Sequence, residues 1–307
     1  MRIGFGAPVS GAWATPDNLG RFAALAEMAG YGSLWTFQRL LVPEGSAMEP
    51  VYHSVLDPVA ALGYAAAVTE RIRLGIAVIN FPYESPAIVA KQAASLDVLS
   101  GGRLDLGLGI GWLPEEFALT GATMAGRGAR VAEYIDVMRR LWGGEVAEFH
   151  GEHYTVPAGW VAPVPVQRPG PPVLLGGMAP RALQRVGRLA DGWVTSSRTD
   201  LSRIAELIAI VQEAAGEAGR DPAQVRIICR GVVRWGAPVI QPEGGGRLAL
   251  SGSFDDIRAD VQMLAERGVT EVFYDLNWDP LVGAPDADPA GAAARAEEIL
   301  EGLAPGR

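Results

Sequence analysis

The chain has 307 residues, of which 49% are hydrophobic and 20% charged, as in packed globular proteins and unlike disordered ones. Its formal net charge of -9 opposes binding to nucleic acid or to an anionic membrane, because most of the surface would repel either polyanion. We therefore expect a small-molecule substrate, with no nucleic-acid partner and no membrane partner.

The single cysteine and the N-terminal residues favour a protein of a reducing compartment. Cys229 alone cannot form a disulfide framework or a cysteine-based metal site, and its apolar neighbours predict a buried, inert thiol. The first residues, MRIGFGAPVSG, are too short and too rich in glycine for a signal peptide. No run reaches the roughly 18 to 20 apolar residues of a membrane span, so we expect a cytoplasmic protein.

Short apolar strands alternate with amphipathic helices along the whole chain. Strands are expected at residues 2–8, 32–37, 72–79, 103–109, 171–175, 191–195, 225–235 and 270–275. Helices are expected at residues 17–28, 58–69, 86–99, 127–142, 181–189, 201–218, 254–267 and 290–303. Eight such alternations without a break in composition predict an α/β fold, a (β/α)8 TIM barrel formed as a single domain over residues 1–307.

Two insertions are expected to interrupt the barrel. A hairpin around His150-Gly151-Glu152 and a proline-rich stretch occupy residues 143–172, after the fourth helix. A loop rich in glycine and proline follows the seventh strand at residues 236–252. Residues 112–126 are expected to be irregular.

The residues just past each strand are the candidates for a site, because active sites of such barrels lie on these loops. They are mainly glycines, aromatic side chains and cations, with almost no carboxylate, no histidine cluster for a metal and no Ser/His/Asp set. This composition favours a large planar anionic cofactor that performs the chemistry itself. The candidates include Gln38, Arg39, Asn80, Gly109, Ile110, Gly111, Trp112, Gly176, Gly177, Met178, Ser196 and Ser197.

Two features are candidates for the binding of an anion. Gly176-Gly177-Met178 precede a helix whose free amides would face a phosphate, although a plain strand-to-helix turn would use the same residues. Arg127 and Arg130 stand at the start of a helix, where anions are preferred, so they indicate either a nearby anionic ligand or solvated arginines.

Three polar residues on the predicted loops have open roles. His53, on the long loop after the second strand, is either a solvated histidine or a substrate contact and proton donor. Glu115 and Glu116 follow Trp112, and a structural cap or a salt bridge is their expected role.

Several segments together resemble a known family. They are GYGSLWTFQRL, RIRLGIAVINFPYESPAIVAKQAASLDVLSGGRLDLGLGIGWLPEEF, RGARVAEY, PVLLGG and LADGWV. With these segments the chain resembles the bacterial luciferase-like superfamily, and within it the branch that uses the deazaflavin coenzyme F420. The resemblance implies a (β/α)8 barrel, often a homodimer, whose flavin-like ring lies across the ends of the third and fourth strands.

The resemblance also implies roles for individual residues. It implies a non-prolyl cis peptide bond at Ala77-Val78 that presses backbone against the ring, with the ring's edge near Gly109, Ile110 and Gly111. It places Arg130 and the turn Gly176-Gly177 at the cofactor phosphate. From their positions at the helix start and the glycine turn, we also expect Arg127 and Met178 to bind the cofactor. We place Phe5 and Trp112 in the substrate pocket.

The chain departs from the family pattern at three positions. Many relatives have Asp-His where this chain has Gln38-Arg39, and the sugar-phosphate dehydrogenase branch has a glutamate at the position of Trp112. Oxidation of an alcohol needs a base, so these changes favour reduction of an activated C=C or C=N bond. Gln38 and Arg39 would hold the ring or a substrate anion, or Arg39 would form a salt bridge with a lid.

The sequence thus predicts an oxidoreductase that transfers a hydride between coenzyme F420 and a small organic substrate, with Gln38, Arg39 and His53 as candidate catalytic residues. One alternative is a monooxygenase of the same superfamily that uses FMN. A second is a catalytically silent protein that binds the cofactor.

Overall fold

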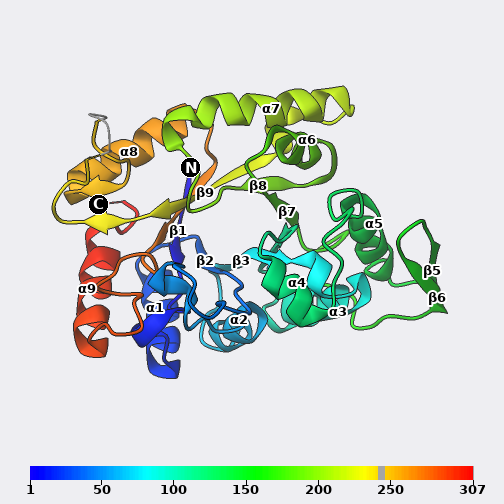
Figure 1. Ribbon diagram of the computed structural model, residues 1–307, viewed down its shortest axis with the longest axis horizontal. Helices are drawn as coiled ribbons and strands as arrows, with labels where there is room; N and C mark the ends of the chain where they lie inside the picture. The colour runs from blue at the N-terminus through cyan, green and yellow to red at the C-terminus, as the bar shows by residue number, and fades with distance from the viewer. Residues whose placement is uncertain (241–245, 307) are drawn as a thin grey trace.

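A closed barrel of eight parallel strands forms the centre of the computed structural model, which describes residues 1–240 and 246–306 (Figure 1). Around the barrel the strands follow the order β1-β12-β9-β8-β7-β4-β3-β2, which confirms the predicted (β/α)8 fold. The strands are β1 (Arg2–Gly6), β2 (Ser33–Thr36), β3 (Arg73–Asn80), β4 (Leu104–Gly109), β7 (Val173–Gly176), β8 (Gly192–Val194), β9 (Arg226–Val232) and β12 (Glu271–Asp275). That residues 1–307 form a single domain stays a prediction.

Helices surround the strands as an outer layer (Figure 1). Most of them begin with a proline in the first turn, and several begin after a side chain that caps the free amides, as Ser85 and Asp288 do. Among the described residues, no helix combines the length and the apolar character needed to cross a bilayer. The barrel helices are α1 (Pro16–Met28), α2 (Pro58–Ala67), α3 (Pro86–Leu99), α5 (Val131–Leu141), α6 (Pro180–Leu189), α7 (Ile204–Glu217), α8 (Phe254–Glu266) and α9 (Pro289–Gly302).

The structure corrects the prediction in three places. A short helix, α4 (Pro114–Thr120), lies in the stretch expected to be irregular, because two turns are too short to show a helical stripe in sequence. The helix predicted over 127–142 begins at Val131. The strand predicted over 225–235 ends at Val232, and Arg234–Trp235 (β10) instead pair with Ser251–Gly252 (β11) outside the barrel. Part of the insertion expected at 236–252, residues 241–245, lies outside the described residues.

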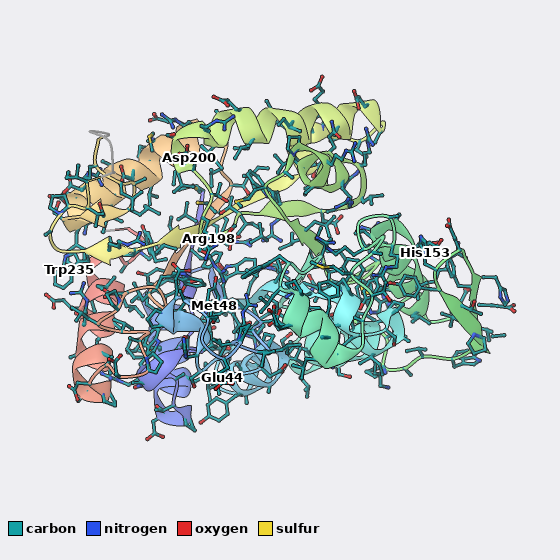
Figure 2. All side chains as sticks on the ribbon, viewed as in Figure 1. Glu44, Met48, His153, Arg198, Asp200 and Trp235 are labelled. Atoms are coloured by element: carbon teal, nitrogen blue, oxygen red, sulfur yellow. The ribbon has the colours of Figure 1, made fainter. Side chains whose placement is uncertain are left out.

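The predicted hairpin is present as β5 (Ala147–His150) and β6 (Thr155–Gly159), paired antiparallel. It projects from the barrel beside α5, and His153 marks its turn (Figure 2). This insertion is therefore peripheral to the ends of the barrel strands.

Buried charges close the barrel at the amino ends of its strands. Asp105 is fully buried on β4 and lies 2.7 Å from Nη2 of Arg73 and 2.7 Å from Nη1 of Arg226. Arg226 also lies 3.1 Å from Glu271. Burial alone would raise the pKa of Asp105, but the hydrogen bonds from Arg73 and Arg226 outweigh it and hold that pKa below its ordinary value.

We predict that Asp105→Asn lowers the free energy of unfolding by about 3 kcal/mol, because it leaves two partly buried guanidinium groups without their shared anion. Urea denaturation at neutral pH measures this. The matched control is Asp136→Asn, which breaks the exposed pair with Arg140 and should cost no more than about 0.5 kcal/mol.

The difference between wild type and Asp105→Asn should also depend on pH. Since the folded pKa of Asp105 is lowered, its stabilisation is fully present above the unfolded value of about 3.9 and is lost as the pH falls through the folded value. The difference should therefore be constant from about pH 5 to 8 and shrink below about pH 4. A difference that grows on acidification would contradict the assigned ion pairs.

Candidate active site

The carboxyl ends of the barrel strands surround a cavity of about 410 Å³. Its walls come from β3, β4, β7, β8 and β9 and from the segments that follow β2, β4, β7 and β8. Fifteen of the residues proposed from the sequence line it together: Gln38, Arg39, Ala77, Val78, Asn80, Gly109, Ile110, Gly111, Trp112, Arg127, Gly176, Gly177, Met178, Ser196 and Ser197. The cavity therefore coincides with the predicted site.

The wall formed by β3 bulges toward the cavity. The Ala77-Val78 peptide bond is cis, as the resemblance implies, and the register between β3 and β4 shifts between Ile76 and Ile79. The Val78 side chain lies over glycines of the neighbouring strands. A Cβ added at Gly109 would stand 2.6 Å from Cγ2 of Val78, and one added at Gly176 would stand 3.3 Å from its Cγ1. The protein's own packing therefore needs the small residues on this wall.

Gln38 holds the end of β3 in place. It is buried, and its Oε1 accepts the backbone N–H of Asn80 at 2.9 Å. Oδ1 of Asn80 in turn accepts the backbone N–H of Gly111 at 3.1 Å. The two amide side chains thus join the loops after β2, β3 and β4 into one rim.

Arg39 forms a salt bridge, one of the two roles that the sequence left open for it. Its Nη1 lies 3.0 Å from Oε1 of Glu116 on α4, and both side chains are buried. The guanidinium lies over the rings of Tyr52, at 4.6 Å, and Trp112, at 5.1 Å. Glu116 also accepts the backbone N–H of Leu40 at 2.8 Å. Arg39 therefore fixes α4 and Trp112 over the cavity, and Glu116 has the expected salt-bridge role.

Two features of the cavity suit an anion. Gly177 has a φ of +141°, a conformation that favours glycine, and it turns the chain from β7 toward the amino end of α6. Between α4 and α5, Arg127 donates to the carbonyls of Gly111, at 3.3 Å, and Met124, at 3.1 Å. Among the described residues, no carboxylate pairs with Arg127, so its charge is available to a ligand.

Three of the proposed residues do not line the cavity. Phe5 is fully buried against Tyr31, because Gly4 and Gly6 face the barrel interior and the alternation along β1 turns Phe5 toward the helices. Its assignment to the substrate pocket is corrected. His53 is exposed at the end of a 3-10 turn, where its backbone N–H bonds to Pro50. Arg130 precedes α5 and donates to the carbonyl of Thr123.

Several lining residues were missed from the sequence: Phe37, Tyr52, Val194, Thr195, Arg198 and Arg230. Arg230 is the most distinctive, because its side chain is only 9% exposed and lies within an apolar strand. Ile228 packs inside the barrel, so the alternation along β9 places Arg230 on the same inner face. An arginine at the open end of the strand, in phase with inward-facing apolar residues such as Ile228, is a signal that the sequence contained.

Arginines dominate the charge of the cavity. Its lining contains Arg39, Arg127, Arg198 and Arg230, and no aspartate or glutamate among the described residues. Arg198, labelled in Figure 2, lies on the loop after β8 and pairs at 3.3 Å with Glu49 of the loop after β2. The site can thus attract an anionic ligand but offers no carboxylate to act as a base.

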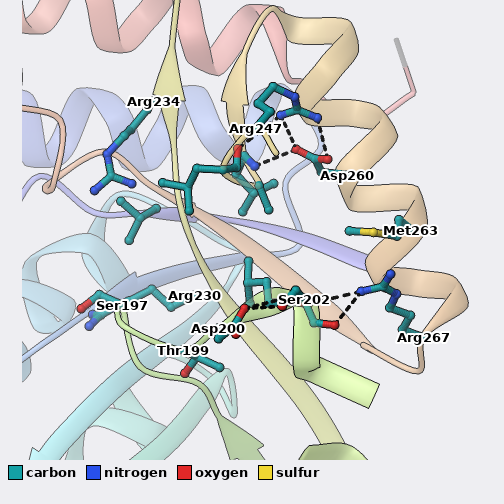
Figure 3. A pocket seen from close by; sticks show the side chains of 15 residues that line it. Ser197, Thr199, Asp200, Ser202, Arg230, Arg234, Arg247, Asp260, Met263 and Arg267 are labelled. Carbon is teal, nitrogen blue, oxygen red and sulfur yellow. Dashed lines mark hydrogen bonds and ion pairs between the residues drawn. The ribbon is translucent and has the colours of Figure 1, made fainter. Parts of the chain in front are cut away.

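A second cavity, of about 250 Å³, adjoins the first, and Ser197 and Arg230 line both (Figure 3). Two other arginines of this second cavity, Arg247 and Arg267, already bind protein groups. Arg247 lies 2.8 Å from Asp260, and Arg267 donates to the carbonyl of Ser202 at 3.1 Å. Arg230 thus stands at the junction of the two cavities.

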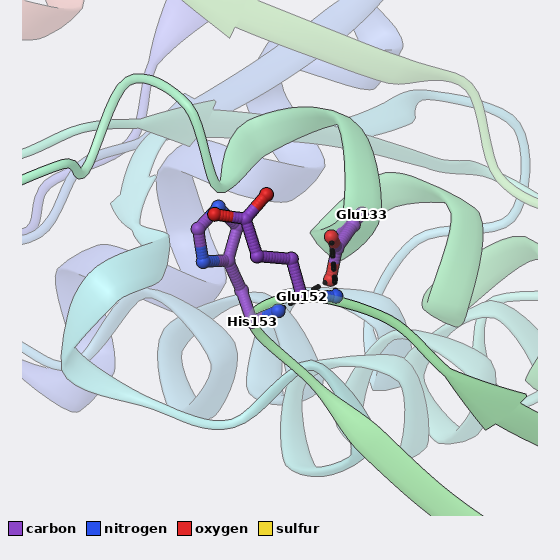
Figure 4. A group of neighbouring side chains, drawn as sticks. All are labelled: Glu133, Glu152 and His153. Carbon is purple, nitrogen blue, oxygen red and sulfur yellow. Dashed lines mark hydrogen bonds between the residues drawn. The ribbon is translucent and has the colours of Figure 1, made fainter.

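A group of titratable side chains far from the cavity has a structural role (Figure 4). Glu133 of α5 accepts the backbone N–H groups of Glu152 and His153, each at 2.9 Å, and of Tyr154 at 3.2 Å. These bonds, that of His153 first, hold the pKa of Glu133 below its ordinary value. Its carboxylate therefore anchors the hairpin to the barrel.

We predict that Gly109→Ala costs about 2 kcal/mol of stability, because the new methyl overlaps Val78 and Oδ1 of Asn80, at 2.6 and 2.8 Å. Combining it with Val78→Ala should recover at least about 0.5 kcal/mol relative to the sum of the single changes. Thermal and urea unfolding of the four proteins measure this coupling.

The matched control for this cycle is Gly63→Ala, in α2, where an added Cβ meets nothing within 4 Å. It should change stability by no more than about 1 kcal/mol, in the stabilising direction, because alanine favours a helix. Strictly additive effects of Gly109→Ala and Val78→Ala would show that the two residues do not contact as described.

Comparisons with known proteins agree with this geometry. A family model described as luciferase-like monooxygenase matches residues 4–238. An uncharacterised protein of Mycobacterium tuberculosis is 36% identical over 78% of this chain and 73% of its own length. An F420-dependent glucose-6-phosphate dehydrogenase of Microbacterium testaceum is 30% identical over 70% of this chain and 63% of its own length.

Solved structures share the fold over nearly the whole chain. The monooxygenase RslO1 of Streptomyces bottropensis superposes with a TM-score of 0.79 at 21% identity, covering 99% of both chains. The coenzyme F420-dependent tetrahydromethanopterin reductase of Methanopyrus kandleri gives 0.77 at 18% identity, covering 99% of this chain and 98% of its own. With the barrel, the cavity at its strand ends and these matches, the chain belongs to the bacterial luciferase-like family.

Proposed function

We propose that this protein binds coenzyme F420 in the cavity at the strand ends and uses it to reduce an activated C=C or C=N bond of a small organic substrate. The observation that carries the proposal is the lining itself, which has four arginines and no carboxylate among the described residues. Such a site binds an anionic cofactor and leaves the redox chemistry to it. Similarity to F420-dependent relatives supports this choice of cofactor.

The residues present fit a planar anionic group. Ala77, Val78 and Val194 offer an apolar surface for a ring. The glycine turn at Gly176-Gly177 and the guanidinium of Arg127 would hold its phosphate. When bound, F420 supplies a carrier for a hydride, and the protein's part is to bind it, orient it and exclude water.

Reduction is favoured over alcohol oxidation because the described lining has no histidine or carboxylate to remove a hydroxyl proton. Arg39, at the position where many relatives have a histidine, is engaged with Glu116. The phenol of Tyr52 lines the cavity and is a candidate to donate a proton to the reduced substrate.

Two alternatives remain distinct from this proposal. An FMN-dependent monooxygenase would use the same barrel, since the structural neighbours include a monooxygenase and a riboflavin lyase with modified FMN. A catalytically silent protein would bind the cofactor and turn nothing over. The relatives that name F420 favour the deazaflavin over FMN.

Titration of the purified protein with F420 and with FMN, followed by fluorescence, separates the two cofactors. We expect F420 to bind at least about tenfold more tightly than FMN. The opposite order of affinities would overturn the proposal.

A second experiment tests turnover: reduced F420 should be consumed with a panel of enones and cyclic imines. Tight binding without consumption across the panel would favour the silent alternative.

We further propose that the protein is a homodimer. Large apolar side chains are exposed on and beside neighbouring helices: Tyr64 on α2, Val68 just after α2, and Ile88 and Leu99 on α3, with Leu99 72% exposed. Sedimentation equilibrium should give twice the mass of the chain, and Leu99→Glu should shift it toward the monomer. A wild-type protein that sediments as a monomer would contradict this. The expected cytoplasmic location stays a prediction.

A further inference from the structure

Arg230 lies on the wall of the cavity opposite the bulged strand. Four steps around the barrel separate β9 from β3 in either direction, through β8, β7 and β4 or through β12, β1 and β2. Both Arg230 and the Ala77-Val78 segment line the cavity between these walls. A ligand that occupies the β3 side would therefore leave space bounded by Arg230.

The guanidinium of Arg230 has donors that the protein does not use. Its Nε lies 3.1 Å from Oδ2 of Asp275 but in a geometry that makes no hydrogen bond. Among the described residues, none accepts a hydrogen bond from this guanidinium, which carries five N–H groups. The other oxygen of Asp275 is engaged, because it accepts the backbone N–H of Asn277 at 3.0 Å.

Aromatic rings keep this guanidinium in place. It lies over the rings of Trp278, at 4.7 Å, Phe37, at 5.1 Å, and Phe273, at 5.6 Å. Rings attract the cation over their faces but accept no strong hydrogen bonds from its edge. The group is therefore rigidly placed while its donors stay free, which is the arrangement that a binding site for an oxygen ligand needs.

A second arginine of the same strand provides an internal comparison. Arg226, at the closed end of the barrel, donates to both oxygens of Asp105, at 2.7 and 3.1 Å, and to Glu271 at 3.1 Å. The guanidinium of Arg226 is thus bound by carboxylates of the protein itself. Arg230, four residues further along β9 at the open end, has one carboxylate nearby, that of Asp275, and makes no hydrogen bond with it.

We propose that Arg230 binds an anionic oxygen of the substrate, and that the substrate is a small organic carboxylate. The proposal rests on the proposed function, in which the cofactor occupies the β3 side of the cavity. The planar fork of an arginine matches the two oxygens of a carboxylate. Because Asp275 already offsets part of its charge, Arg230 suits a monoanion better than a doubly charged phosphate.

The experiment compares acids with their neutral isosteres by calorimetry on the full chain, with and without F420. The probes are benzoate, cinnamate and sorbate, each against its primary amide, and inorganic phosphate. We expect at least one acid to bind about tenfold more tightly than its amide, and phosphate to compete about tenfold less well than that acid. A wild-type protein without this preference, including one that binds none of the probes, overturns the proposal.

Variants assign the preference to Arg230. Arg230→Met should weaken the acid about tenfold and leave its amide within about twofold, and Arg230→Lys should weaken the acid less, because it keeps the charge without the fork. The matched control is Arg203→Met, which removes an exposed charge outside the cavity and should leave both affinities unchanged. If Arg198→Met loses the preference and Arg230→Met keeps it, the anion binds at the rim and the proposal is wrong.

A folded variant is available even if the single change unfolds the barrel. Arg230→Gln combined with Asp275→Asn removes both charges together, and Oδ1 of the new asparagine can still accept from Asn277. This double variant should bind acid and amide alike, and a retained preference would contradict the proposal. If the protein binds F420 but does not prefer acids, the inference about Arg230 is wrong and the proposed function is not affected. If the protein prefers acids, this preference depends on Arg230, and F420 does not bind, then the proposed function is wrong and the inference about Arg230 is not affected.

Discussion

The contact of Val78 with the glycines of two neighbouring strands is the constraint on which the candidate site depends. Cβ atoms added at Gly107, Gly109 and Gly176 would stand 3.2, 2.6 and 3.3 Å from the methyl carbons of Val78. The bulge of β3 can face the cavity only because β4 and β7 carry no side chains there. The position of Asn80 follows from this bulge, and through Asn80 the positions of Gln38 and the loop at Gly111.

The buried charged side chains have different partners at the two ends of the barrel. At the closed end, Asp105 binds Arg73 and Arg226, and these ion pairs contribute to stability. At the open end, Arg39 is paired with Glu116 and holds the rim, whereas Arg127 and Arg230 keep donors or charge that face the cavity. The same residue type thus contributes to stability at the closed end and offers positive charge to a ligand at the open end.

Much of this organisation could be predicted from the sequence, because the barrel repeats one unit with a clear period. The helix predicted over 86–99 has the same bounds in the structure, and residues at the ends of the third, fourth and fifth barrel strands meet at one cavity. The prediction for Phe5 is wrong because successive side chains of a strand point to opposite faces. A shift of one residue along β1 therefore decides whether a side chain faces the barrel interior or the helices. Whether the N–H groups of Arg230 are hydrogen-bonded depends on the orientation of the Asp275 carboxylate, 45 positions away in sequence. A local sequence pattern therefore could not predict that they are free.

The most direct measurement is a crystal structure of the protein with F420 bound. The ring should lie against Ala77 and Val78 on β3, with the cofactor phosphate at Gly176-Gly177 and open space between the ring and Arg230. A ring bound outside this cavity, or one that fills the side next to Arg230 and leaves Val78 uncovered, would contradict the proposed arrangement of cofactor and substrate.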